Sequence, residues 1–255
     1  MAQQQAAEAQ ARKEQQGKLF RFFLQEIGGK GSGKFEEARI TFVDGDLDPK
    51  QGVLLPPRYY EHFLYFGGSY QNFVCPEKTL PESNDVCPIC ELGDKKLLPS
   101  LVSLFTIIDH RQYKGQNDKI YQYTRKLLVA KPQTFELLNK LATSLGGLSG
   151  RTFDVSRVGD KSASVGSLFI PVGDKESPEV LKKKFMRTWK DPKTNEDKYE
   201  TNFQVPDYEQ EIVFRNGLQM RQMGLGKPST GVAMAPGGSS PEGQTAEQID
   251  YSKEL

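Results

Sequence analysis

Apolar and polar residues alternate along much of the central chain, and this pattern predicts short β-strands joined by turns. The run ARITFV is expected to form a strand at 38–43, and LVSLFTIID, the most apolar run, a buried strand at 101–109. After the polar turn RQYKGQND, the sequence KIYQYTRKLLVAKP should return as a second long strand. RTFDVSRV and SVGSLFIPV predict another hairpin around Gly159 and Asp160.

Two segments have the pattern of helices instead. Residues 133–145 place a set of apolar side chains on one helical face, namely Phe135, Leu138, Leu141 and Leu145, and two glycines follow. The run SPEVLKKKFMRTW at 177–189 is predicted to be a helix capped by Ser177. Several hairpin strands with one helix between them favour a mostly β fold with added helices, an OB-fold (Greek-key β-barrel).

An aromatic-rich hairpin is predicted at 58–74, where rings alternate with polar and small residues and Gly67-Gly68 suits the turn. Its rings are Tyr59, Tyr60, Phe63, Tyr65, Phe66, Tyr70 and Phe73. Alternation in a strand places one set of side chains toward the core and the other set away from it.

Composition divides the chain of 255 residues into a body and two ends. Residues 1–17 are rich in Gln and Ala and are expected to be a flexible arm, and residues 18–214 the folded core. Residues 215–255 are rich in Gly, Pro and Ser and end in a weakly acidic cluster, so a disordered tail is expected. Without a secretory signal or a long apolar run, a cytoplasmic protein is expected.

All three cysteines of the chain, Cys75, Cys87 and Cys90, lie in one segment, and the last two form Cys-Pro-Ile-Cys. This spacing lets two thiolates reach one metal ion from a tight turn. An odd number of cysteines argues against a disulfide framework. The pattern predicts one structural Zn²⁺ in an inserted zinc-binding subdomain at about 58–100.

Zinc prefers four ligands in a tetrahedron, so a fourth donor is required. The chain has two histidines: His62 lies within the cysteine-containing segment, and His110 follows a later strand. We favour His62, with His110 as the alternative. A full set of four protein ligands leaves no open position for a catalytic water.

No motif of an enzyme is complete. Residues 28–34 match the first part of a phosphate-binding loop, but Phe35 stands where Ser or Thr should hold magnesium, and a strand follows instead of a helix. The deaminase signature requires His-x-Glu, whereas His62 is followed by Phe63 and Leu64. The protein is therefore expected not to be an enzyme.

Basic and aromatic residues gather along the hairpin at 111–131. Rings stack unpaired bases and cations follow phosphates, so this hairpin is a candidate surface for single-stranded nucleic acid. Its candidate contacts are Arg111, Tyr113, Lys114, Tyr121, Tyr123, Arg125, Lys126 and Lys131. Tyr121 and Tyr123 would share a face and are equally consistent with core positions.

The order His-x12-Cys-x11-Cys-x2-Cys, in an aromatic hairpin preceded by ARITF, resembles the zinc-containing single-stranded-DNA-binding proteins of T-even bacteriophages. The resemblance spans roughly residues 35–190 and implies that His62, Cys75, Cys87 and Cys90 bind the zinc ion. It implies a protein that coats and protects single-stranded DNA in replication, recombination and repair. Self-association along DNA and recruitment of replication and recombination proteins by the C-terminal tail would also follow.

A zinc-ribbon adaptor that binds proteins or duplex DNA in transcription is the alternative from another functional class. Both interpretations use a structural metal, but they differ in the surface that carries the partner. Relative affinity for a single strand and for a duplex of equal length distinguishes them.

Overall fold

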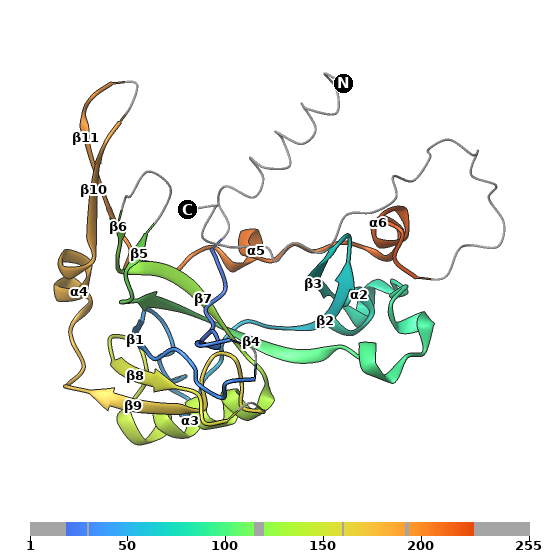
Figure 1. The fold of residues 1–255 in the computed structure, drawn as a ribbon, viewed down its shortest axis with the longest axis horizontal. Coiled ribbons are helices and arrows are strands. Elements are labelled where there is room, and N and C mark those ends of the chain that lie inside the picture. The colour runs from blue at the N-terminus through green and yellow to red at the C-terminus, as the bar shows by residue number, and fades with distance from the viewer. Residues whose placement is uncertain (1–18, 30, 115–119, 160, 192–193, 227–255) are drawn as a thin grey trace. The chain divides into compact units, whose positions relative to one another are not determined.

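The computed structural model describes residues 19–29, 31–114, 120–159, 161–191 and 194–226. Its regular elements are mostly β-strands, as expected, and they form two compact units (Figure 1). The first unit contains Met1–Arg58 and Val102–Ile212, and the second contains Tyr59–Leu101 and Val213–Leu255. In the sequence, the second unit therefore interrupts the first.

The first unit is built on an antiparallel sheet with the strand order β7-β4-β1-β8-β9. Its strands are β1 (Ala38–Phe42), β4 (Ser100–Asp109), β7 (Thr124–Ala130), β8 (Thr152–Ser156) and β9 (Leu168–Val172). β4 is buried along almost its whole length, as its continuous apolar run predicts. The strands predicted at 38–43 and 101–109 and the hairpin predicted over 151–172 are thus confirmed. The long strand predicted for KIYQYTRKLLVAKP is interrupted instead: β7 begins at Thr124, and Tyr123 before it has a φ of 56°.

Helix α3 (Pro132–Leu145) lies between β7 and β8 in the sequence and covers the core of the sheet. Leu138 and Ala142 are fully buried, and the rest of the predicted apolar stripe packs against the same cluster. The helix ends at Gly146, whose positive φ of 73° is the left-handed conformation that glycine adopts without a steric penalty. Phe42 lies centrally in this core, with edge-on contacts to Phe105 and Phe153.

The sheet is not closed into a barrel by its strands, because β7 and β9 do not pair in the part of the chain that the structure describes. Instead, the segment following residue 18 bridges toward both: the amide of Phe22 donates to the carbonyl of Leu127 in β7, at 2.7 Å. The amide of Leu24 donates to the carbonyl of Ser164, before β9, at 2.8 Å. The expected mostly β fold is therefore present as an antiparallel sheet, and its strands do not close into a barrel within the described residues.

Helix α4 (Pro178–Lys184) begins at Ser177 as predicted, but it is shorter than the predicted 177–189. Phe185 follows it and is buried with Leu181 and Phe203, and a two-stranded ribbon then extends from the unit (Figure 1). The ribbon consists of β10 (Met186–Lys190) and β11 (Asp197–Thr201). The helix prediction was wrong past residue 184 because MRTWK alternates and pairs with a partner strand that the local pattern does not reveal.

Shorter elements complete the first unit. They are the paired strands β5 (Tyr113–Lys114) and β6 (Ile120–Tyr121), and helix α5 (Tyr208–Glu211). α5 is anchored by Tyr208, whose hydroxyl donates to the buried carboxylate of Asp44 and lies 2.7 Å from the Thr106 hydroxyl. None of the helices among the described residues is both long enough and apolar enough to cross a membrane.

The second unit contains the predicted aromatic hairpin and a set of short helices around the cysteines. The hairpin is β2 (Arg58–Phe66) paired with β3 (Ser69–Val74), and Gly67 and Gly68, both with positive φ, form its turn. The helices are α2 (Pro76–Thr79), the 3-10 helices η1 (Pro81–Ser83), η2 (Cys90–Leu92) and η3 (Lys95–Leu97), and α6 (Gly217–Gln222).

The chain ends differ from the expected limits. Order was expected to fade from residue 215, yet α6 and the residues to 226 are ordered, with Met220 and Leu225 buried. The arm at 1–17 and the remainder of the proposed tail, residues 227–255, lie outside the described residues.

Candidate metal centre

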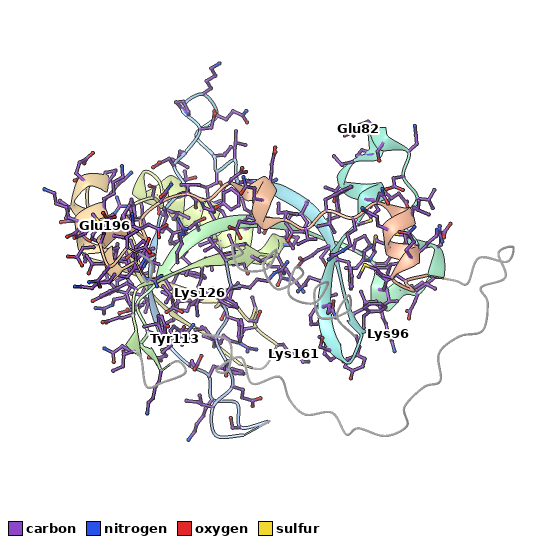
Figure 2. The ribbon with its side chains drawn as sticks, turned by 90° about the horizontal axis from the view of Figure 1, so that it is seen from above. Glu82, Lys96, Tyr113, Lys126, Lys161 and Glu196 are labelled. Atoms are coloured by element: carbon purple, nitrogen blue, oxygen red, sulfur yellow. The ribbon has the colours of Figure 1, made fainter. Side chains whose placement is uncertain are left out.

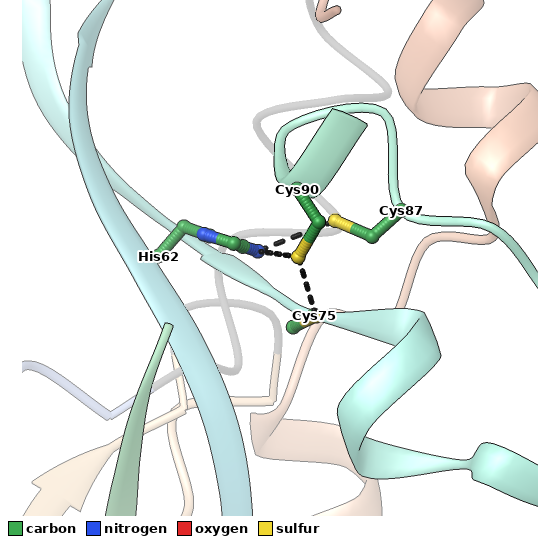
Figure 3. Close-up of side chains that lie close together, drawn as sticks. All are labelled: His62, Cys75, Cys87 and Cys90. Atoms are coloured by element: carbon green, nitrogen blue, oxygen red, sulfur yellow. Dashed lines mark hydrogen bonds between the residues drawn. The ribbon is translucent and has the colours of Figure 1, made fainter. Parts of the chain in front are cut away.

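His62 is placed on the inward side of β2 and is completely buried. Its Nδ1 atom donates a hydrogen bond to the backbone carbonyl of Leu97, at 2.6 Å. This bond fixes the ring and leaves Nε2 directed at the three cysteine sulfurs (Figure 3). A backbone carbonyl on the second nitrogen is the usual support of a metal-binding histidine.

The cysteines come from two local structures. Cys75 directly follows β3, and its amide donates to the carbonyl of Tyr60 on β2 at 2.8 Å, so the hairpin fixes its position. Cys87 and Cys90 lie on one tight turn, in which the amide of Glu91 donates to the carbonyl of Cys87 and that of Gly93 to the carbonyl of Cys90. Gly93 has a φ of 69°, which lets the chain leave the turn.

The four ligand atoms are close enough to surround one ion, since all lie within 4.8 Å of one another. The Sγ atoms of Cys75 and Cys90 are 3.7 Å apart, and Nε2 of His62 is 3.2 Å from Sγ of Cys87 and 3.7 Å from Sγ of Cys90. Tetrahedral ligands with metal–sulfur bonds of about 2.3 Å lie roughly 3.5–3.8 Å apart. The described residues thus contain a His/Cys3 cluster that could hold one metal ion.

The pKa values of the three thiols differ. A hydrogen bond from the Cys75 thiol lowers the pKa of Cys87 to about 4, with a further contribution from His62. Burial raises the pKa of Cys90 to about 11, and the pKa of Cys75 is raised by its bond to Cys87 and by burial. Since a metal binds thiolates, loading of this cluster would release protons.

Helix α6 packs onto the cysteine turn, which sequence reasoning missed. The amide of Gly217 donates to the Asp85 carboxylate at 2.8 Å, and a Cβ at this glycine would lie 2.2 Å from the carbonyl oxygen of Val86. Arg221 forms an ion pair with Glu91 at 2.6 Å, and Met220 packs in the same cluster as the cysteines. The capping box of Asn216 and Gln219 was a local signal that could have revealed this helix.

His110 lies in the other unit and has a different environment. Its Nε2 hydrogen-bonds to the hydroxyl of Thr41 at 2.8 Å, and its ring packs edge-on against Tyr123 and Phe185. Burial, with the charge of Lys184, lowers the pKa of His110 to about 4. His110 is therefore a core residue of the sheet unit, and the cluster takes His62 as its fourth member.

The predicted nucleic-acid hairpin contains a buried ion-pair network. Arg111 contacts the fully buried Asp109 at 2.7 Å and Glu36 at 2.5 Å, and Lys126 contacts Asp109 at 3.3 Å. Tyr113 donates to Asp109 and lies beneath Lys126, which is 3.9 Å from its ring centroid (Figure 2). Burial would raise the pKa of Asp109, but Arg111 and Lys126 outweigh it and hold that pKa below its usual value. These cations balance a buried carboxylate.

The remaining predicted contacts are dispersed. Tyr123 packs with the His110 and Phe185 rings, as the core interpretation of this residue anticipated, and it has a φ of 56°. Arg125 donates to the carbonyl of Gln204 at 3.1 Å. Lys114 and Lys131 are exposed, and Tyr121 is half-buried on β6. Of the eight predicted contacts, the structure brings Arg111, Tyr113 and Lys126 together around Asp109, and Tyr121 lies directly across from Tyr113.

The residues on either side of the glycine-rich stretch at 28–34 pair with each other. The amide of Ile27 donates to the carbonyl of Lys34 at 2.9 Å, and the Glu26 carboxylate accepts from the amide of Gly33 at 3.1 Å. The next regular element is β1, so the stretch lacks the helix that follows a phosphate-binding loop.

Comparison of the chain with protein-family models, with curated proteins and with solved structures finds no match. The candidate metal centre and the order of the strands are therefore the features from which a function has to be argued.

Proposed function

We propose that this protein binds single-stranded DNA through an OB-type sheet unit and that one structural zinc ion stabilises its second unit. The observation that carries the proposal is the strand order β7-β4-β1-β8-β9 with α3 inserted between β7 and β8. Numbered along the sheet unit alone, this is the order 3-2-1-4-5 with a helix after the third strand. That connectivity is typical of the partly open Greek-key barrels that bind oligonucleotides and oligosaccharides.

Zinc is the proposed metal because three thiolates and one imidazole in a closed tetrahedral set are typical of structural zinc sites. The cluster is buried apart from Cys90 and has a protein donor for each of the four positions. With four protein ligands, zinc contributes folding free energy and leaves no site for a reacting water.

The proposed role in the cell rests on the resemblance described in the sequence analysis. A protein that binds exposed single strands without a catalytic step acts stoichiometrically: it coats and protects the strand during phage DNA replication, recombination and repair. The ligand order His62, Cys75, Cys87, Cys90 supports this assignment through the resemblance to the zinc-containing phage proteins. Replication proteins and neighbouring copies on the strand are the proposed partners.

The test compares a labelled oligo-dT with a duplex of equal length. We expect tighter binding of the single strand, weakening steeply with added salt because cations released from phosphates drive association. Equal or tighter binding of the duplex would contradict the proposal. Elemental analysis of protein purified without chelator should find one zinc per chain.

A second candidate function, an adaptor that binds another protein, is favoured by one feature of the second unit. Three rings on the outward face of the β2–β3 hairpin are exposed and touch one another: Phe63 stacks on Tyr70 at 5.2 Å between ring centroids, and Tyr65 meets Tyr70 at 5.3 Å. No Lys or Arg occurs between Tyr59 and Val74, so Arg58 at the start of β2 is the one cationic side chain of these two strands. We call Phe63, Tyr65 and Tyr70 the ring triad.

The ring triad gives this second candidate its own test. Replacing Tyr65 and Tyr70 with Ser should abolish binding of a protein partner and leave the affinity for oligo-dT unchanged. Loss of oligo-dT affinity in this variant would assign the triad to DNA instead.

A further inference from the structure

A single-strand-binding surface needs cations that are free to contact phosphates, and the predicted hairpin offers few. Arg111 and Lys126 form ion pairs with Asp109, and their side chains are only 16% and 14% exposed. Withdrawing them would leave a buried carboxylate without its partners, which is costly. Arg111 and Lys126 are therefore poorly suited to contact phosphates, and exposed cations elsewhere in the sheet unit are better placed to do so.

Free cations gather where α4 ends and β10 begins. Lys182, Lys183 and Arg187 are exposed, and none of them has an ion pair in the part of the chain that the structure describes. Lys184 differs, since it is paired with Glu176 at 2.7 Å. The early end of α4 produces this arrangement: the lysines occupy its last turn, and Arg187 begins the ribbon.

One face of the β10–β11 ribbon combines a ring with two cations. Arg187 and Trp189 are two residues apart and therefore share a face, and the guanidinium of Arg187 lies 5.6 Å from the centroid of the Trp189 ring. Lys198 lies directly across from Trp189 on β11, and its ion pair with Glu196, at 3.6 Å, is an exposed one that a phosphate can replace at little cost. Glu200, across from Arg187, is the one acidic residue of this face within the two strands. We call Arg187, Trp189, Lys198 and the two lysines Lys182 and Lys183 the arm site.

The ribbon lacks a core of its own. On its second face Tyr199 is 67% exposed and Met186 is 45% exposed. A two-stranded ribbon with both faces in water is marginally stable by itself, so a ligand that lies along it would contribute to its order. Trp189 is partly exposed on a strand that already carries cations, as a base-stacking platform requires.

The geometry points to the arm site as a contact surface for single-stranded DNA, in which Trp189 stacks on a base while Lys182, Lys183, Arg187 and Lys198 contact phosphates. This inference rests on the proposed function and assigns the binding residues to a segment other than the 111–131 hairpin. Stacking of a base on an aromatic ring is tolerant of sequence, and the cations make binding dependent on salt.

Trp189 is the single tryptophan of the chain, so its fluorescence reports on this site alone. Fluorescein-labelled oligo-dT is titrated with the full chain, and anisotropy of the label measures binding wherever it occurs on the protein. Selective excitation of Trp189 in a parallel titration measures contact at the arm site. We expect quenching of Trp189 with the same midpoint as the rise in anisotropy.

Substitutions of Trp189 and of the two lysines separate the contribution of the ring from that of the charges. Trp189→Ala should weaken oligo-dT binding by about tenfold, and Trp189→Phe should recover most of the loss because a ring is restored. Lys182→Ala with Lys183→Ala should lower the slope of log affinity against log salt by about 1.4, the value for two phosphate contacts on a single strand. Lys50→Ala with Lys140→Ala removes the same charge from two other exposed positions and should keep the wild-type slope.

The outcomes distinguish the two proposals. If anisotropy shows no binding of oligo-dT by the wild-type chain, the proposed function itself is wrong. If anisotropy shows binding while Trp189 fluorescence is unchanged and Trp189→Ala binds as the wild type does, the arm site is wrong and the proposed function stands. Circular dichroism of each variant verifies that the fold is retained.

Discussion

The two units of the molecule reach stability by different means. Among the described residues, the sheet unit has a main hydrophobic cluster of seventeen buried residues, with Phe42 at its centre. The second unit, which contains the His/Cys3 cluster and is called the metal unit below, has a hydrophobic cluster of six buried residues. Two of these are the cysteines Cys75 and Cys87. A small core buries too little apolar surface to offset the entropy lost on folding, so such units commonly depend on a metal or a disulfide.

This difference assigns distinct roles to the two histidines. His62 is the nitrogen donor of the His/Cys3 cluster that could hold a metal ion, whereas His110 is a ring within the aromatic packing of the sheet unit. The same residue type therefore stabilises one unit when it binds metal and the other unit only while it is uncharged. Each role gives a way to perturb one unit selectively.

The largest expected effect is loss of the metal. Replacing Cys87 with Ser should reduce the zinc content below one per chain and remove hydrogen-exchange protection from residues 59–101. Binding of structural zinc contributes on the order of 10 kcal/mol in small zinc-dependent units, so this loss should unfold the metal unit. Backbone amides of β1 and β4 in the sheet unit serve as the internal reference.

A matched pair of histidine variants checks the ligand assignment. His62→Asn should lose zinc as Cys87→Ser does, and His110→Asn should retain one zinc per chain by elemental analysis. Full zinc content in His62→Asn would reject the cluster as the metal site.

The second effect concerns α6 and its packing onto the cysteine turn. Met220→Ala should destabilise the metal unit by about 2–4 kcal/mol, because a fully buried side chain is removed from a core with few other members. Leu218 on the same helix is 65% exposed, so Leu218→Ala should change stability by less than about 0.5 kcal/mol. Urea unfolding of both variants, monitored by the release of zinc, measures these effects. Equal urea midpoints for Met220→Ala and Leu218→Ala would show that α6 does not stabilise the metal centre.

The third effect is a pH dependence of the sheet unit. The folded pKa of His110 is lowered to about 4, below the ordinary value of 6.5, so the folded state binds its proton less readily than the unfolded state does. Stability from this group is complete above the unfolded pKa and is lost as pH falls toward the folded pKa, by roughly 2 kcal/mol near pH 4.5.

The comparison of wild type with His110→Asn isolates that contribution. Asp44, whose pKa burial raises to about 6, gains stability as pH falls and so acts in the opposite direction. Because both proteins contain Asp44, its effect cancels in the difference between them. Urea midpoints from about pH 7 to pH 4.5 should fall more for the wild type, and parallel curves would contradict the assignment.

The sequence predicted the neighbours of the four cluster residues better than the neighbours of the basic hairpin residues, and the reason is the range of the interactions involved. Cys87 and Cys90 are linked by a local turn, and His62 and Cys75 by one hairpin, so their spacing was informative. The pairing of Arg111 and Lys126 with Asp109 depends on how β4 and β7 pair, and a pattern of basic residues does not show that the charges are already neutralised.

Long-range packing also explains the errors at element limits. β10 continues from α4 as a strand because β11 pairs with it, and α6 is ordered because its glycine fits against Val86, far away in the sequence. Local propensity predicted a helix where β10 forms and a disordered tail where α6 forms. The strand order of the sheet unit likewise arises from pairing between strands that no local pattern specifies.

The smallest expected effect compares the two faces of one hairpin in the metal unit. Phe73 points inward and is buried, whereas Tyr65 points outward and contacts only ring Tyr70 among the aromatic pairs of the described residues. Tyr65→Ala should therefore cost only about 0.5 kcal/mol, the value of one exposed ring pair, and zinc content should remain one per chain. Phe73→Ala is the matched control on the inward face and should cost about 3 kcal/mol or more.

If Tyr65→Ala proves as destabilising as Phe73→Ala, the ring triad is a structural element of the metal unit. If its cost is small, the three rings are exposed without a stabilising role, and a binding role for that face remains the explanation that the partner experiment with Tyr65 and Tyr70 tests directly.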